Sequence, residues 1–173
     1  MKFLVFIAPN NFKDETVSMI KNFFNKWGVE YQITSYSNKD CVGYHGVVIK
    51  PDVNAGKVSA SDYDGIILVD GNGMEEYKLF EYRPLLDTVM LFNEKGKLIV
   101  AINNSIKVTA RANIIKDKKI ATPELDELKR LVLLFHGIPS ENGMEISGNI
   151  VTIKESRGLE VPLQEMLQHI GVM

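Results

Sequence analysis

The sequence of 173 residues has one cysteine, no basic excess and no long hydrophobic run. A single cysteine cannot form a disulfide within the chain, so nothing here requires an oxidising compartment. The 20 Lys and Arg residues are outnumbered by 22 Asp and Glu residues, which gives a formal net charge of −2. A protein that binds nucleic acid through its phosphates needs a basic excess, so the composition disfavours this class.

The apolar runs are too short to cross a membrane. Residues 3–9 and 65–69 fall far below the roughly 18 residues that a transmembrane helix needs. The N-terminal run resembles the apolar part of a signal peptide, but Asn10 and Asn11 follow it without a cleavage site of small residues. We therefore predict a buried first strand here, no membrane contact and a cytoplasmic location.

What the chain does have is the pattern of a globular α/β protein. Its hydrophobic fraction of 45% is ordinary, and its length suits one domain over residues 1–173. Strands are predicted at residues 2–8, 30–35, 65–69, 98–102 and 119–121, and a hairpin at 144–153 around Gly148-Asn149. Helices are predicted at residues 14–27, 84–95, 106–113, 122–135 and 159–170. This alternation predicts a mainly parallel sheet with helices on both faces.

Three local features refine this pattern. Asp14 is predicted to cap the first helix and Gly28 to end it. The segment 37–61 is rich in glycine around one short β-like run, which predicts a hairpin or a small antiparallel excursion. Residues 70–73 read as a tight turn after a buried strand.

Ligand sites of parallel sheets lie at the carboxyl ends of the strands. In this chain, the segments 9–15, 70–73 and 103–105 each follow a predicted strand. The candidate pocket residues at these turns are Asp70, Gly71, Asn103 and Asn104.

Five stretches of the sequence carry a family resemblance through their order and spacing. They are residues 7–14, 43–52, 63–71, 96–102 and 148–152. Together they make the chain similar to the ThiJ/PfpI superfamily of deglycase-like proteins and intracellular proteases, which have the class I glutamine amidotransferase-like fold. The resemblance implies a flavodoxin-like three-layer α/β sandwich and a homodimer, with contacts through the first helix or residues 47–53.

Active members of this family carry a cysteine at the bend after the fourth long strand, in a pattern like Ala-Ile-Cys-His-Gly-Pro. The resemblance places Asn103 at the cysteine position and Asn104 at the neighbouring histidine position. It places Thr16 where the family has an acidic partner, a glutamate that contacts the cysteine. Glu15 lies one residue earlier, a rotation of about 100° on a helix, and is the alternative acid if the alignment shifts by one residue. The family's oxyanion-stabilising Gly-Gly corresponds to Asp70-Gly71.

These departures imply that the family's cysteine-dependent chemistry is absent. A carboxamide is neither a nucleophile nor a general base at neutral pH. Asparagine does tolerate the left-handed backbone region better than other non-glycine residues, so Asn103 could preserve the strained bend without its chemistry.

Two functions therefore stay open. The first is a non-catalytic family member that binds a small ligand or a partner. The second is a hydrolase or glyoxalase-like enzyme (amidase, protease or deglycase type) with a relocated nucleophile, either Ser105 or Cys41. Ser105 is predicted to cap the helix that follows it, and His45 is the one candidate base in the segment around Cys41.

Metal and cofactor chemistry are not predicted. The three histidines have no metal-binding spacing, and the Gly-containing turn at residues 70–73 does not fit a phosphate loop.

Overall fold

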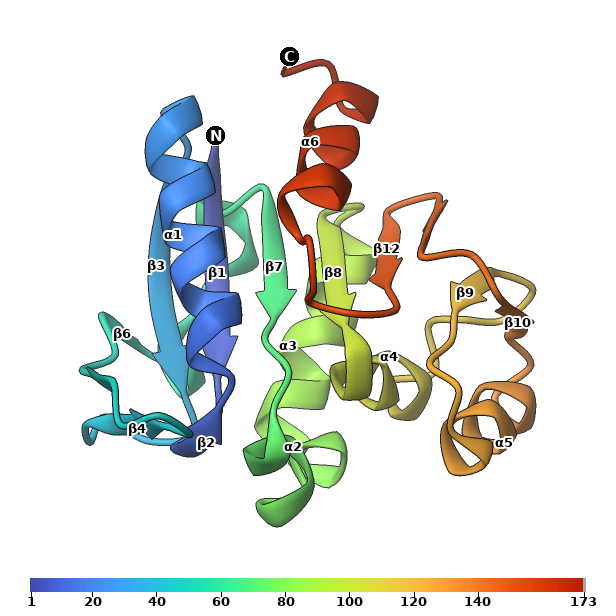
Figure 1. Cartoon of the computed structure of the whole chain (residues 1–173), viewed down its shortest axis with the longest axis horizontal. Helices are drawn as coiled ribbons and strands as arrows, with labels where there is room; N and C mark the ends of the chain where they lie inside the picture. The colour runs from blue at the N-terminus through green and yellow to red at the C-terminus, as the bar shows by residue number, and fades with distance from the viewer. Residues whose placement is uncertain (173) are drawn as a thin grey trace.

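A seven-stranded sheet forms the centre of the computed structural model, which describes residues 1–172 (Figure 1). The strand order is β11-β12-β8-β7-β1-β3-β6. The strands are β1 (Lys2–Ile7), β3 (Glu30–Ser35), β6 (Val53–Asn54), β7 (Gly65–Leu68), β8 (Leu98–Ile102), β11 (Met144–Ser147) and β12 (Ile150–Ile153). All neighbours pair in parallel except β11, which is antiparallel to β12 and closes the predicted C-terminal hairpin.

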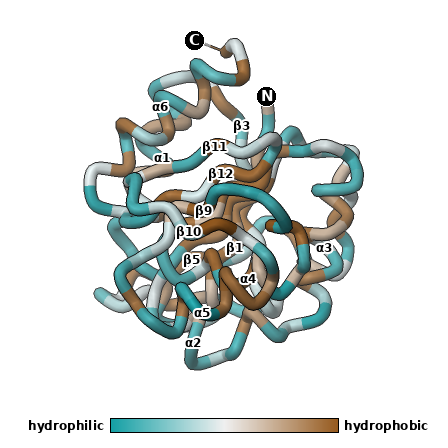
Figure 2. The backbone as a smooth tube through the Cα atoms, turned by 90° about the vertical axis from the view of Figure 1, so that its right-hand side faces the viewer, coloured by the Kyte–Doolittle hydropathy of each residue, from teal (hydrophilic) through white to brown (hydrophobic). Residues whose placement is uncertain are grey.

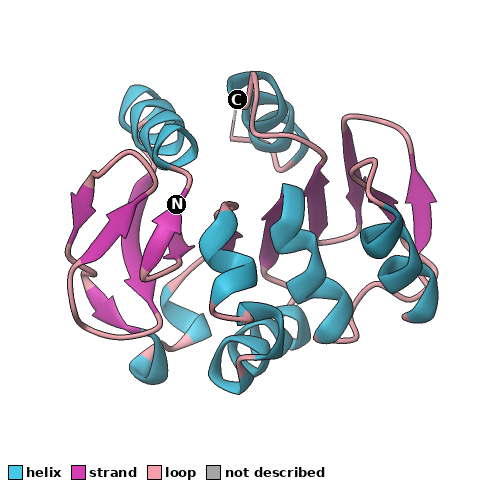
Figure 3. Ribbon diagram, turned by 60° about the horizontal axis from the view of Figure 1, so that its bottom comes forward, coloured by secondary structure: helices cyan, strands magenta, loops and turns pink. Residues whose placement is uncertain are grey.

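The sheet lies between two layers of helices (Figure 3). The helices are α1 (Asp14–Trp27), α2 (Asn72–Glu76), α3 (Arg83–Glu94), α4 (Ile106–Arg111), α5 (Asp126–Leu134) and α6 (Glu160–His169). Helices α1 and α6 contact each other on one face, and α3 packs against β7 and β8 on the other. The predicted flavodoxin-like three-layer α/β sandwich is confirmed.

Burial explains why the central strands are continuous apolar runs. Every residue of β7 and all but the first residue of β1 and β8 are buried, because helices cover both faces of the sheet. Phe24 of α1 stacks on Phe3 of β1 with ring centroids 5.2 Å apart. Figure 2 shows the same segregation, with hydrophobic strands at the centre and hydrophilic loops outside.

Segment 37–61 contributes to a second, smaller sheet at the carboxyl ends of the main strands. Strand β2 (Asn10–Phe12) pairs in parallel with β4 (Cys41–Gly43), which pairs in antiparallel with β5 (Val48–Ile49). The antiparallel excursion is thus confirmed, whereas the three-residue strand β2 was not predicted. This sheet brings the loop between β4 and β5 close to the ends of β1 and β7.

Several short elements lie outside the predicted pattern. A second parallel pair joins β9 (Lys119–Ala121) to the unpredicted β10 (Ile138–Ser140). The predicted tight turn at residues 70–73 was wrong in part, because helix α2 already begins at Asn72. Four 3-10 turns complete the structure: Ala55–Lys57, Ala60–Asp62, Leu79–Glu81 and Asn103–Ser105.

The predicted cap of α1 was also wrong. Lys13 is the N-cap residue, and Asp14 is already helical. The Asp14 carboxylate instead accepts the backbone N–H groups of His45, at 2.9 Å, and Val47, at 3.1 Å. Gly28 ends the helix in the left-handed conformation, as predicted.

Within residues 1–172, none of the helices combines the length and apolar character needed to span a bilayer.

Candidate functional site

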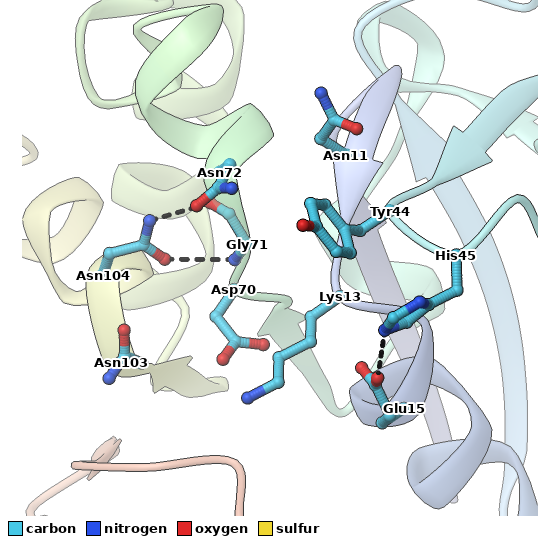
Figure 4. A pocket seen from close by; sticks show the side chains of 10 residues that line it. All are labelled: Asn11, Lys13, Glu15, Tyr44, His45, Asp70, Gly71, Asn72, Asn103 and Asn104. Atoms are coloured by element: carbon cyan, nitrogen blue, oxygen red, sulfur yellow. Dashed lines mark hydrogen bonds and ion pairs between the residues drawn. The ribbon is translucent and has the colours of Figure 1, made fainter.

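A cavity of about 350 Å³ lies at the carboxyl edge of the main sheet. The turns after β1 and β7, the bend after β8 and the first residues of helices α1 and α2 build it, and the β4–β5 loop closes one side (Figure 4). Its lining residues are Asn11, Lys13, Glu15, Tyr44, His45, Asp70, Gly71, Asn72, Asn103 and Asn104. The structure therefore brings all four predicted pocket residues together around one space.

Asn103 forms the bend between β8 and the following helical turns. Its φ angle is +49°, in the left-handed region that non-glycine residues rarely adopt. Its side-chain Nδ2 donates to the backbone oxygen of Lys154 at 2.9 Å, which ties the bend to the end of β12. The strained geometry is thus present at this position, with a carboxamide as its side chain.

Asn104 pairs with the backbone of Gly71 through both ends of its amide. Asn104 Nδ2 donates to the Gly71 oxygen at 2.8 Å, and the Gly71 N–H donates to Asn104 Oδ1 at 3.2 Å. Gly71 has a φ of +134°, and a Cβ there would lie 2.6 Å from the oxygen of Asn11. The backbone donor that could stabilise an oxyanion at this turn is therefore already engaged by a neutral side chain.

Asp70 is a buried carboxylate at the floor of the cavity. Thr16 is fully buried and donates its hydroxyl to Asp70 Oδ1 at 2.7 Å. Lys13 Nζ donates to the hydroxyl of Ser156 at 2.7 Å, and Ser156 in turn lies against Asp70. Burial raises the pKa of Asp70, although Thr16, the charge of Lys13 and Ser156 all act in the opposite direction.

Glu15 reaches the cavity but not as a partner of the bend. Its carboxylate lies 2.9 Å from His45 Nε2, and both side chains are more than half exposed. The edge of the His45 ring contacts the neighbouring Tyr44, with centroids 5.0 Å apart. A carboxylate next to an imidazole can orient the ring.

The buried Asp14 carboxylate fixes the position of this loop. Burial alone would raise the pKa of Asp14, but the N–H groups of His45 and Val47 hold it below the usual range. The β4–β5 loop is therefore attached to the first turn of α1 by charge-assisted hydrogen bonds, which present Tyr44 and His45 to the cavity.

The two candidate nucleophiles, Ser105 and Cys41, are both buried outside the cavity. Ser105 is fully buried, and its hydroxyl accepts the N–H of Ile102 at 2.8 Å while facing the backbone oxygen of Leu68 at 2.8 Å. Ser105 is the N-cap residue of α4, as predicted, but its side chain makes no capping hydrogen bond because the hydroxyl bonds to the preceding Ile102 and to Leu68. Cys41 is fully buried as well, and burial raises the pKa of its thiol. Neither side chain lines the cavity.

Sequence reasoning missed half of the cavity wall. Asn11, Lys13, Tyr44 and Asn72 were not predicted as site residues, and His45 was considered only as a base for Cys41. The segments 9–15 and 43–52 had been noted, but nothing in the sequence shows that the small second sheet folds them over the bend. In residues 1–172, no group of three or more His, Cys, Asp or Glu side chains is arranged to hold a metal ion.

Comparison with known proteins shows which family the chain belongs to. The profile of the DJ-1/PfpI family matches residues 1–158. The chain belongs to the DJ-1/PfpI family. The ThiJ/PfpI resemblance of the sequence is thereby confirmed.

Relatives within the DJ-1/PfpI family differ in what is known of them. The chain is 33% identical over 157 residues to an uncharacterised protein, MJ0967, from Methanocaldococcus jannaschii, covering 88% of this chain and 74% of the relative. It is 25% identical over 116 residues to the deglycase PH1704 from Pyrococcus horikoshii, covering 67% and 69%. The crystal structure of a ThiJ/PfpI domain protein from Brachyspira murdochii shares the fold, with a TM-score of 0.90 at 20% identity over 99% of this chain and 97% of that one.

The buried carboxylate at the cavity floor gives a pH-dependent prediction. Because the folded-state pKa of Asp70 is raised, its ionisation destabilises the fold at neutral pH, and this penalty disappears below the unfolded value near 3.8. Asp70→Asn should therefore raise the urea midpoint at pH 7, and the gain should shrink as the pH falls towards 3.8. Urea unfolding of both proteins between pH 3.5 and 8 measures this difference. A loss of stability in Asp70→Asn that grows as the pH rises would show that the ionised carboxylate is favourable, and an equal change at every pH would show that its folded-state pKa is not raised.

Proposed function

We propose that this member of the DJ-1/PfpI family is non-catalytic and binds a small molecule in the cavity at the carboxyl edge of its sheet. One observation carries the proposal. The bend after β8 keeps a left-handed backbone, at a φ of +49°, while its side chain is the carboxamide of Asn103. The geometry that presents a nucleophile is retained, and the group that would react is not there.

The neighbours of Asn103 support the same proposal. A nucleophilic enzyme needs a thiol or hydroxyl within hydrogen-bond reach of a base. The hydroxyl of Ser105 is enclosed by backbone groups, and the Cys41 thiol is buried away from the cavity. The Gly71 N–H is held by Asn104, so electrostatic stabilisation of an oxyanion is weakened too.

The cavity itself supports a binding role. Its volume of about 350 Å³ lies at the small end of the range typical of small-molecule sites. Its walls come from segments far apart in the chain, and they are held by specific hydrogen bonds such as those of Asn103, Asn104 and Asp14.

An enzyme with a relocated nucleophile is the alternative, and the Glu15–His45 pair favours it. An imidazole 2.9 Å from a carboxylate can act as a general base. This alternative requires Ser105 or Cys41 to leave its present surroundings and reach that imidazole, since neither lines the cavity.

Turnover assays separate the two proposals. Purified protein should convert methylglyoxal and simple amide or ester substrates no faster than buffer does, because no activated nucleophile faces the cavity. Asn103→Ala, Ser105→Ala and Cys41→Ala should give the same background rate. Turnover by the natural protein that is abolished by any one of these changes would contradict the non-catalytic proposal and identify the reacting group.

A homodimer and a cytoplasmic location complete the proposal. Apolar side chains are exposed where the sequence suggested a contact: Trp27 of α1 is 40% exposed, Val47 is 47% exposed and Val48 is 60% exposed. Covering them in a symmetric interface would remove apolar surface from water. The one cysteine is a free thiol, which suits the reducing cytoplasm.

Analytical ultracentrifugation tests the dimer. At micromolar concentration the natural protein should sediment at twice its 19.5 kDa mass. Val48→Lys should shift the equilibrium towards monomer at least tenfold, since a charge would be buried at the interface. Lys95→Ala, at an exposed position at the end of α3 and outside both proposed contact segments, serves as a control for nonspecific effects. A monomer for the natural protein would contradict the proposed assembly.

A further inference from the structure

The charged groups of the cavity are already matched with one another or with fixed hydroxyls. Glu15 is paired with His45, and Asp70 accepts the hydroxyl of Thr16. Lys13 donates to Ser156, which lies against that same Asp70. Lys13 has two N–H donors besides the one bound to Ser156, but its charge already acts on Asp70. A charged ligand would therefore compete with an opposite charge of the protein, so its own charge gives little gain in affinity.

The cavity is also unfavourable for anions in particular. Asp70 and Glu15 both line it, and the Gly71 N–H is occupied by Asn104. An anionic group would therefore meet two carboxylates as well as the single ammonium of Lys13, and it would find the Gly71 donor engaged.

Several neutral side chains of the cavity wall have hydrogen-bond donors or acceptors that are not used within the protein. In the described part of the chain, the side chains of Asn72 and Tyr44 make no hydrogen bond, although both line the cavity. Asn103 and Asn11 use only their Nδ2 groups, towards Lys154 and Glu76, so their amide oxygens remain available. The wall thus offers acceptors from two amide oxygens and both donors and acceptors from Asn72 and Tyr44.

Hydroxyl groups match this arrangement best. Each hydroxyl can donate to an amide oxygen and accept from an amide N–H, whereas a carboxylate only accepts and an ammonium only donates. Tyr44 is 63% exposed at the cavity wall, and its ring offers an apolar surface for the carbon face of a small ring. The volume of about 350 Å³ suits one such ring rather than an extended polymer.

We infer that the cavity binds a neutral, polyhydroxylated small molecule of monosaccharide size, recognised by Asn72, Asn103, Asn11 and Tyr44. This inference rests on the proposed binding function and adds the chemical class of the ligand.

Titrations with sugars of one ring size and different charge test the inference. The probes are D-glucose, D-glucuronate and D-glucosamine, with D-ribose and myo-inositol as further neutral probes, each added to isotope-labelled protein and followed by backbone NMR. At least one neutral probe should shift the amide signals of Gly71, Asn72 and Asn103 saturably. D-Glucose should bind at least fivefold more tightly than either charged analogue.

The outcomes separate this inference from the proposed function. Tighter binding of glucuronate or glucosamine at the same amides would overturn the ligand class but support a binding site. No saturable shift with any of the three neutral probes would also overturn the inference, whereas the non-catalytic character is judged by the turnover assays.

Matched variants locate the binding. Asn72→Ala should weaken neutral-probe binding about fivefold, the effect expected for one neutral hydrogen bond, and Tyr44→Phe should do so while keeping the ring. Asn22→Ala, at an exposed position of α1 that does not line the cavity, should leave the affinity unchanged. Equal weakening by Asn22→Ala, or unchanged affinity in both cavity variants, would contradict the assignment.

Discussion

The bend at Asn103 is the constraint around which the site is organised. A left-handed residue between a buried strand and a helical turn costs backbone strain, of order 1–3 kcal/mol, and persists only where its surroundings fix it. Here Asn103 is bonded to Lys154, and Ser105 returns its hydroxyl to the backbone of Ile102 and Leu68. The side chain held at this strained bend is a carboxamide at the edge of a polar cavity.

Polar side chains surround the bend at Asn103, and their hydrogen bonds link neighbouring turns. Thr16 donates to Asp70, so the carboxylate of this region comes from the end of β7 rather than from helix α1. Asn104 pairs with Gly71 and links the turns after β7 and β8. Each neutral hydrogen bond of this kind contributes about 1 kcal/mol to stability. Together they make the bend a structural junction with an adjoining cavity.

The main sheet could be predicted because the apolar composition of its strands indicates that they are buried on both faces. Continuous apolar runs such as 65–69 and 98–102 are typical of strands covered on both faces, and both lie in the centre of the sheet. The short strands and helices have no comparable apolar run in the sequence. Strands β2 and β10 have three residues each and exist through pairing with distant segments, and α2 is a five-residue helix that begins with Asn-Gly.

The site was predictable only in part, for the same reason. Asp70, Gly71, Asn103 and Asn104 follow long strands, so their convergence follows from topology. Tyr44 and His45 reach the cavity because a carboxylate about 30 residues away, Asp14, binds their loop, and local propensity had favoured that aspartate as a helix cap. A side chain with two possible local roles cannot be assigned without its distant partners.

Labelling of the native protein tests the central claim most directly. The protein would be exposed to iodoacetamide and to a fluorophosphonate, and its intact mass would be measured against a sample unfolded in urea. The account predicts no adduct on the native protein within minutes and one alkylated thiol, Cys41, in the unfolded sample, because burial shields that thiol and raises its pKa. Rapid labelling of Cys41 or Ser105 in the native protein would reveal an activated nucleophile and contradict the account.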